Sequence, residues 1–179
     1  MIGTLTWLPA RSRPDLLAEP VAAALAGSGP DDALVAEIDP GLADTAAFCA
    51  AYEVPPEVSA NCVVLAARRA GATALAACVV LATTRADVNR RARHELGARK
   101  ASFAAVDDAV AATGMEYGGI TPVGLPAGWT VLVDAAVAAA DRVVVGSGLR
   151  RSKLLLPGPA VAALPGARAV EGLGLPATG

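Results

Sequence analysis

Glycine is concentrated in two turns of the C-terminal half of this chain. The first turn lies within Thr113–Gly124, and the second is Gly146-Ser147-Gly148. Glycine is favoured where the backbone must bend to positive φ or must approach a ligand closely, because it has no Cβ atom. Two such turns in one small domain predict a pocket that is walled by main-chain N–H groups rather than by reactive side chains.

Few side chains of the chain suit conventional catalysis. The only histidine is His94, and the three cysteines, Cys49, Cys62 and Cys78, stand far apart in apolar segments. Their spacing differs from the C-x-x-C pairs of metal or redox sites, so we expect three reduced, buried thiols of a cytoplasmic protein. There is no serine-elbow motif and no metal-ligand spacing, and the sequence therefore predicts neither a metal nor a cofactor.

The chain has 179 residues, which is the usual size of one domain, so we expect residues 1–179 to form a single domain. Hydrophobic residues make up 54% of it, but only 3% are aromatic, because alanine and valine supply most of the apolar character. No run of about 18 charge-free apolar residues occurs, so no membrane-spanning helix is expected. The first residues also lack the pattern of a secretory signal, which agrees with a cytoplasmic location.

Charge is distributed unevenly along the chain. The net charge is −2, but residues 1–60 hold 2 basic and 9 acidic residues, whereas residues 61–179 hold 13 basic and 8 acidic residues. This asymmetry indicates a nucleic-acid-facing half behind a nearly neutral average. The alternative is that the basic runs are ordinary solvated helix faces.

Apolar runs and turn signals alternate along the chain and predict interleaved helices and strands. Strands are predicted at residues 33–38, 61–67, 74–81, 98–104, 130–133, 142–145, 154–156 and 167–170. Helices are predicted at residues 14–26, 43–52, 84–96, 106–112 and 159–164, with a short alanine helix after residue 133. The irregular spacing implies both hairpins and crossovers, which favours a mixed sheet of the α/β or α+β class.

An ordered set of short motifs runs through these elements. The motifs are Ala-Asp-Thr-Ala-Ala-Phe-Cys at 43–49, Ser-Ala-Asn-Cys-Val-Val-Leu at 59–65, Ala-Cys-Val-Val-Leu-Ala-Thr at 77–83, Leu-Gly-Ala-Arg-Lys at 96–100, Thr-Gly at 113–114, Gly-Gly-Ile-Thr-Pro at 118–122, Val-Asp at 133–134 and Val-Gly-Ser-Gly at 145–148. In this order they resemble the editing domain of bacterial prolyl-tRNA synthetase and its free-standing YbaK/EbsC-type relatives, which are aminoacyl-tRNA deacylases. The resemblance covers roughly residues 35–171. It leaves 1–34 as an N-terminal helical extension packed on that core and 172–179 as a tail.

The resemblance implies both a fold and an activity. The implied fold is α/β, with a mixed, curved, partly barrel-like sheet and surrounding helices. The implied reaction is hydrolysis of the ester that joins a wrong, small amino acid to the terminal adenosine of tRNA, so the tRNA acceptor end is the expected partner. The Gly-x-x-x-Pro loop, which consists of Gly118, Gly119, Ile120, Thr121 and Pro122, would supply main-chain donors near the aminoacyl carbonyl, with water as the nucleophile. Fixed N–H groups can stabilise the negative charge that develops on that oxygen.

The chain departs from the family pattern at one position. The family has Lys-Thr or Lys-Ser at the start of the first long strand, where the lysine helps to hold the terminal nucleotide, whereas this chain has Asn61 and Cys62. Asparagine can donate a hydrogen bond but brings no charge. Arg150, Arg151 and Lys153 are the candidates for compensation and for tRNA binding. The alternative is an exposed cationic rim with no specific partner.

The remaining candidates are loop residues, each with a structural alternative. Met115 and Tyr117 would shape the amino-acid pocket or anchor the loop, and Glu116 would orient a water or sit as a solvated turn residue. The second turn, which consists of Gly146, Ser147 and Gly148, would contact substrate; the hydroxyls of Thr121 and Ser147 would bind it or satisfy the turn backbone. Asp134 is included as a substrate contact, although an N-cap role suits it better.

Two other functions stay open at this stage. One is a binding module of the same fold that holds tRNA ends or a nucleotide after losing its chemistry together with the lysine. The other is a small-molecule pocket protein unrelated to tRNA. Weakening of tRNA binding by salt would argue against the second, because phosphate contacts release counterions.

Overall fold

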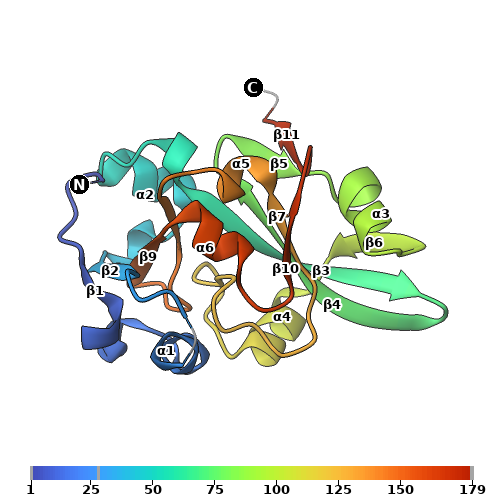
Figure 1. Cartoon of the computed structure of the whole chain (residues 1–179), viewed down its shortest axis with the longest axis horizontal. Coiled ribbons are helices and arrows are strands. Elements are labelled where there is room, and N and C mark those ends of the chain that lie inside the picture. The colour runs from blue at the N-terminus through green and yellow to red at the C-terminus, as the bar shows by residue number, and fades with distance from the viewer. Residues whose placement is uncertain (1, 28, 178–179) are drawn as a thin grey trace.

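The computed structural model describes residues 2–27 and 29–177, and it is built on three β-sheets with short helices around them (Figure 1). The largest sheet has the strand order β10-β7-β4-β3-β6. Its strands are β3 (Ala60–Arg69), β4 (Ala72–Leu81), β6 (Lys100–Phe103), β7 (Val131–Asp134) and β10 (Ala167–Val170). Strand β4 pairs with β7 in parallel, as does β7 with β10, whereas β3 pairs antiparallel with both β4 and β6.

The β3–β4 hairpin is long and projects from the body of the molecule (Figure 1). Its register runs from Ala60 opposite Leu81 to Arg69 opposite Ala72. Only two residues connect the strands, Ala70 with φ 49° and Gly71 with φ 83°. Two consecutive positive φ angles are typical of the tight turn whose twist matches that of antiparallel strands.

The second sheet has the order β1-β2-β9-β8, and all its pairs are antiparallel. Its strands are β1 (Leu8–Pro9), β2 (Leu34–Glu37), β8 (Val143–Gly146) and β9 (Ser152–Leu156). A parallel bridge between Ser59 and Val144 joins it to the start of β3. The third sheet pairs β5 (Thr84–Ala86) with β11 (Gly174–Pro176). The predicted α/β class with a mixed sheet is confirmed, although among the described strands no closed barrel forms.

Short helices connect these strands. They are α1 (Glu19–Ala26), α2 (Thr45–Ala51), α3 (Arg93–Glu95), α4 (Val106–Thr113), α5 (Ala135–Ala138) and α6 (Gly158–Ala162). Single 3-10 turns lie at Ala10–Ser12, Pro14–Leu16, Pro40–Leu42 and Pro56–Val58, and a π-helical turn at Val88–Ala92 leads into α3. Carboxylates cap two of the helices, since Asp44 accepts the N–H of Ala46 and Asp134 accepts that of Ala136.

The core divides between the two faces of the large sheet. On β7, Val131 and Val133 belong to the largest apolar cluster, which also holds α1 and α6 residues, whereas Leu132 points into a cluster with Leu65 and Cys78. This alternation follows from the period of two along a strand. A third cluster lies under α2 around Phe48, which is fully buried.

Two expectations about chain ends and helices are corrected by the pairing of β5 with β11. The helix expected over 84–96 begins later, because Thr84–Ala86 is a strand and Asp87 accepts the N–H of Arg90 at the start of the π-helical turn. Gly174–Pro176, expected to belong to a tail, is the partner strand. Local propensity missed both because each strand exists only through a partner about 90 residues away. Residues 178–179 of the expected tail lie outside the described residues.

The described part of the chain contains no helix of the length and apolar character needed to cross a membrane.

Candidate functional site

The two glycine-rich turns lie directly against each other. The Gly148 N–H donates to the Gly119 carbonyl at 2.7 Å, and the Glu116 N–H donates to the Gly148 carbonyl at 2.9 Å. A Cβ atom on Gly146 would collide with the carbonyl oxygens of Gly119 and Ile120, and one on Gly119 would lie 2.6 Å from the carbonyl carbon of Leu149. Glycine is therefore required at these two positions by the close approach of one backbone to the other.

Some amides of the first turn are free of internal partners. The Gly119 N–H donates to the Glu116 carbonyl at 2.9 Å. Within residues 2–27 and 29–177, by contrast, the N–H groups of Gly118 and Ile120 have no hydrogen-bond acceptor. Gly118 has φ +85°, which places it in the left-handed region. An unpaired main-chain N–H is a strong donor, so this turn can bind an oxygen atom that is brought to it.

A cavity of about 620 Å³ opens beside this turn. The start of β3, the end of β6, α4, the first turn and β9 all contribute to its wall. The lining residues are Ala43, Asp44, Thr45, Ala60, Asn61, Cys62, Val63, Val64, Val80, Thr84, Arg85, Ala86, Phe103, Ala104, Val106, Ala109, Tyr117, Gly118, Ile120, Gly146, Arg150 and Lys153. Its volume lies in the range of pockets that enclose small ligands.

Lys153 is the buried cation of this cavity. Its side chain is 7% exposed, and its Nζ atom donates to the Ala43 carbonyl at 2.9 Å and lies 5.1 Å from the centre of the Phe48 ring. Among the described residues no carboxylate forms an ion pair with it. Burial away from water lowers the pKa of Lys153 from 10.5 to about 8, because the charged form loses hydration. The ammonium group therefore remains mostly protonated at neutral pH, but it is poorly solvated.

Asn61 also lines the cavity and forms a hydrogen bond with Thr45, another lining residue. The Thr45 hydroxyl donates to the Asn61 Oδ1 atom at 2.5 Å. Thr45 begins α2, two residues after Ala43, whose carbonyl accepts from Lys153. The segment 43–45 thus connects Asn61, the position at which the resemblance implies a lysine, to Lys153 on β9.

Arg150 also lines the cavity, but its donors are engaged. Its backbone N–H donates to Glu116 Oε2 at 2.6 Å, its Nη1 donates to the Tyr117 carbonyl at 3.2 Å, and its Nη2 donates to the Pro40 carbonyl at 3.0 Å. Arg150 and Glu116 together tie the first turn to the second. These contacts fix the loop, and the guanidinium keeps its positive charge beside the cavity because it donates to carbonyls and, among the described residues, pairs with no carboxylate.

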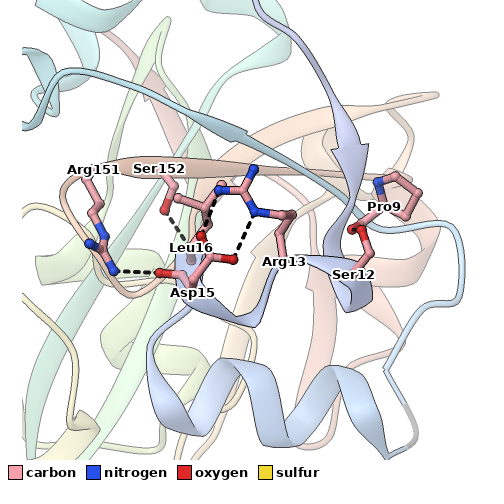
Figure 2. Close-up of polar contacts among 7 residues, drawn as sticks. All are labelled: Pro9, Ser12, Arg13, Asp15, Leu16, Arg151 and Ser152. Carbon is pink, nitrogen blue, oxygen red and sulfur yellow. Dashed lines mark hydrogen bonds and ion pairs between the residues drawn. The ribbon is translucent and has the colours of Figure 1, made fainter.

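The second turn is held from behind by the N-terminal segment (Figure 2). Ser152 Oγ donates to the Leu16 carbonyl at 2.6 Å, and an Arg151 Nη2 donates to the Asp15 carbonyl at 2.5 Å. Asp15 itself pairs with Arg13 at 2.7 Å. In addition, the Ala18 N–H donates to the Ser147 carbonyl at 3.1 Å. The segment before α1 thus braces the second turn and the start of β9.

Comparison of the sequence with family profiles identifies the family of this chain. The sequence profile of the aminoacyl-tRNA editing domain matches residues 39–164. The chain belongs to this family. Among curated proteins no match is found.

Solved structures share the fold of this editing domain. A proposed trans-editing enzyme for prolyl-tRNA synthetase matches with a TM-score of 0.74 at 19% identity, over 86% of this chain and 94% of that one. A scaffold protein from computational epitope grafting matches with a TM-score of 0.74 at 20% identity, over 86% and 95%. The hypothetical protein APE2540 matches with a TM-score of 0.69 at 18% identity, over 79% and 90%.

Of the expected site residues of the editing domain, about half line the cavity. Those that do are Asn61, Cys62, Tyr117, Gly118, Ile120, Gly146, Arg150 and Lys153, whereas Met115, Glu116, Gly119, Thr121, Pro122, Asp134, Ser147, Gly148 and Arg151 lie outside the lining. Lys153 does not fit the alternative of an exposed cationic rim, because β9 carries it beneath α2.

The residues outside the lining have structural surroundings. Met115 is buried in the largest apolar cluster, and Asp134 accepts N–H groups from Ala136 and Gly174. Ser147 is fully buried, with its Oγ 2.7 Å from Ser152 Oγ. Thr121 is also fully buried, but its Oγ1 has no hydrogen-bond partner among the described residues.

Cys62 and His94 have side chains of the types that can act as nucleophile or base. Burial raises the pKa of the Cys62 thiol well above its ordinary value, so it is not a thiolate at neutral pH. His94 is exposed on α3 and is absent from the cavity lining. Within the described residues, no group of three or more histidine, cysteine or acidic side chains is placed to hold a metal ion.

Sequence reasoning missed several lining residues. Phe103 and Val106 flank the turn between β6 and α4, and Arg85 lies in the strand that was expected to be helical. The exposed apolar character of Phe103 and Val106 could have served as a signal, but a sequence does not show which apolar residues stay exposed.

Proposed function

We propose that the cavity hydrolyses the ester between a small, wrongly attached amino acid and the terminal adenosine of a tRNA that is free of its synthetase. The observation that carries the proposal is that one cavity is lined both by Gly118 and Ile120, whose N–H groups have no acceptor among the described residues, and by Lys153 with its buried ammonium group. Membership of the aminoacyl-tRNA editing family supports the substrate class.

The chemistry needs no activated side chain. Water adds to the ester carbonyl, and the oxygen that becomes negative receives hydrogen bonds from the free N–H groups of the first turn. The C–O bond to the ribose then breaks, the ribose oxygen takes a proton delivered through water, and the products are the free amino acid and uncharged tRNA. Aminoacyl esters are already activated, so holding the carbonyl beside fixed donors contributes much of the rate increase.

Lys153 supplies the positive charge that Asn61 does not bring. Its ammonium group lies in the cavity wall and has one protein acceptor, the Ala43 carbonyl, so donors remain for a ribose or phosphate oxygen. We assign Arg150 to holding the loop, and Asn61, together with Thr45, to a neutral hydrogen-bonding surface beside the lysine.

The test is a deacylation assay with tRNAs mischarged with small amino acids. The wild-type protein should release the amino acid from at least one of them, and Lys153→Met should lower kcat/KM roughly tenfold to a hundredfold, the usual range for losing a hydrogen bond from a charged group. Arg151→Met is the matched control, since Arg151 is a cation two residues away that faces the N-terminal segment, and it should retain activity. A complete panel left intact by the wild type would reject the proposal.

The second candidate is a tRNA-end or nucleotide-binding module that has lost hydrolysis. Asn61 in the lysine position of the family favours it. Asn61→Lys separates the two: if hydrolysis appears only in the variant, the natural chain is a binding module, and if the variant loses existing hydrolysis, Lys153 has taken over the charge.

A further inference from the structure

The exposed large hydrophobic side chains of the molecule gather at the cavity. Among the described residues, three large apolar side chains are exposed: Phe103 at 63%, Tyr117 at 61% and Val106 at 45%. All three line the cavity. Phe48, Tyr52, Trp7 and Trp129 are buried or half-buried. In a chain with only 3% aromatic residues, two exposed rings at one cavity mark a binding surface.

Each ring is carried by a backbone that is held in place. Phe103 ends β6, where it lies opposite Leu65, and the next residue, Ala104, donates its N–H to the Val64 carbonyl at 2.9 Å. The Tyr117 carbonyl accepts from Arg150 Nη1. Val106 begins α4, three residues after Phe103. The rings are thus presented to solvent from ordered positions, so little entropy is lost when a flat ligand stacks on them.

The charges of the lining favour an anionic ligand. The charged side chains are Arg85, Arg150 and Lys153 against Asp44, and the Asp44 carboxylate caps α2 by accepting the Ala46 N–H. Arg85 is exposed and, among the described residues, forms no ion pair. Flat aromatic surfaces beside cations suit an unpaired nucleotide, whose base stacks while its phosphate meets the positive charge.

We propose that Phe103 and Tyr117 form a stacking platform for the unpaired bases at the 3′ end of tRNA, with Arg85 placed to meet the adjoining phosphate. The inference rests on the proposed function for the identity of the nucleic acid. The inference adds the mode of binding, in which the protein contacts the flat faces of the bases rather than their hydrogen-bonding edges. The platform therefore recognises single-stranded ends with little preference for sequence.

The first experiment measures binding without hydrolysis. A fluorescently labelled, uncharged oligoribonucleotide ending in CCA is titrated with protein and followed by anisotropy. Phe103→Ala and Tyr117→Ala should each weaken binding about tenfold, because each removes one aromatic ring on which a base stacks. Phe103→Tyr and Tyr117→Phe keep the ring and should bind like the wild type. Because both side chains are exposed, unchanged urea midpoints are expected for all four variants.

A probe with an abasic terminal nucleotide identifies the base as the stacking group. It should bind the wild type more weakly than the CCA probe, and at least one of the two alanine variants should no longer distinguish the two probes. Arg85→Ala should reduce the dependence of binding on salt, whereas the ring variants should leave that slope unchanged. Equal binding of the CCA probe by the wild type and both alanine variants would overturn the platform. It would also be overturned if the wild type and every variant bound the abasic probe as tightly as the CCA probe, because the terminal base would then contribute nothing to binding.

The outcome is separable from that of the proposed hydrolysis. If the wild type deacylates a mischarged tRNA and the alanine variants keep its KM, the activity stands and the platform is wrong. If no tRNA is deacylated but CCA binding depends on the rings, the platform stands and the activity is wrong. If both hold, the ring variants should raise KM with little change in kcat and should hydrolyse a base-free aminoacyl ester as fast as the wild type.

Discussion

The two glycine-rich turns look alike in sequence but have different surroundings. The first turn has cavity on one side: Gly118 is exposed and its N–H is free. In the second turn Gly146 also lines the cavity, but Ser147 is fully buried and Gly148 packs between the Gly119 carbonyl and Ala18. In the first turn, glycine at position 118 permits a positive φ beside open donors. In the second, glycine at position 146 permits close packing.

The difference extends to the cations that follow the second turn. Arg150 holds the first turn, Arg151 holds the N-terminal segment, and Lys153 is buried in the cavity wall. Three cationic side chains that are neighbours in sequence thus contact three different parts of the molecule. The comparison shows that the second turn mainly holds other segments in place, whereas the first turn and Lys153 have groups that are available to bind a substrate.

The largest effect is expected from Gly146→Ala. Its methyl group would meet the backbone carbonyls of the first turn, which cannot move aside as a flexible side chain could, so we expect a loss of about 3 kcal/mol or more in the free energy of unfolding. Gly71→Ala is the control, because Gly71 has φ +83° but open space around it, and the strain there should cost about 1 kcal/mol. Urea unfolding measures both; equal losses would mean that the turns do not press on each other.

Lys153→Met should stabilise the protein at neutral pH by about 2 kcal/mol while weakening hydrolysis. The shift of the Lys153 pKa from 10.5 to about 8 disfavours the charged form in the folded state by up to about 3 kcal/mol, and losing the hydrogen bond to Ala43 returns about 1 kcal/mol of that.

The pH dependence of the same pair of proteins tests the cause. Between about pH 8 and pH 10.5 the unfolded chain holds the lysine proton that the folded protein has released, so the stability of the wild type rises with pH across this window. The difference between Lys153→Met and the wild type should therefore shrink toward pH 10.5. If the difference in the free energy of unfolding between the two proteins stayed constant with pH, the Lys153 ammonium would be solvated rather than buried.

Ser147→Ala should destabilise the protein by roughly 1–3 kcal/mol. Its hydroxyl is buried and bonded to the Ser152 hydroxyl at 2.7 Å and to the Ser152 carbonyl at 3.1 Å, so truncation leaves buried groups without a partner. Ser12→Ala removes a hydroxyl bonded to the Pro9 carbonyl at the exposed edge of the same N-terminal segment and should cost much less. If thermal melts show that Ser147→Ala and Ser12→Ala lower the stability by similar amounts, the Ser147 hydroxyl is not enclosed in the second turn.

Thr121→Val should have the smallest effect on stability and, unlike the glycine and serine substitutions, should not destabilise the protein. The Thr121 hydroxyl of the first turn is buried without a partner among the described residues, so its replacement by a methyl group should be neutral or stabilising by about 1 kcal/mol. A loss of stability in urea would reveal a partner for this hydroxyl. Deacylation should be unaffected, because Thr121 does not line the cavity.

Sequence patterns predicted the elements that depend on local signals. The apolar runs of β3 and β4, the hairpin between them and the strand–helix–strand unit around α5 all follow from patterns within about 20 residues. The N-cap role of Asp134 follows from its place between strand and helix. The strands β5 and β11 escaped prediction because neither has a strong pattern of its own, and each is stabilised only by the other.

The sequence by itself determined where glycine must lie, which segments carry the core and which turns carry the candidate site. Tertiary structure alone decided that Lys153 enters the cavity while Arg151, two residues before it, does not. Arg151 lies in the turn before β9 begins at Ser152, and the pairing of Lys153 with Ala36 and Gly146 places its side chain beneath α2. The sequence shows the charges and their spacing. Whether a charged side chain is buried or exposed depends here on segments more than 100 residues away, such as those of Ala36 and Ala43.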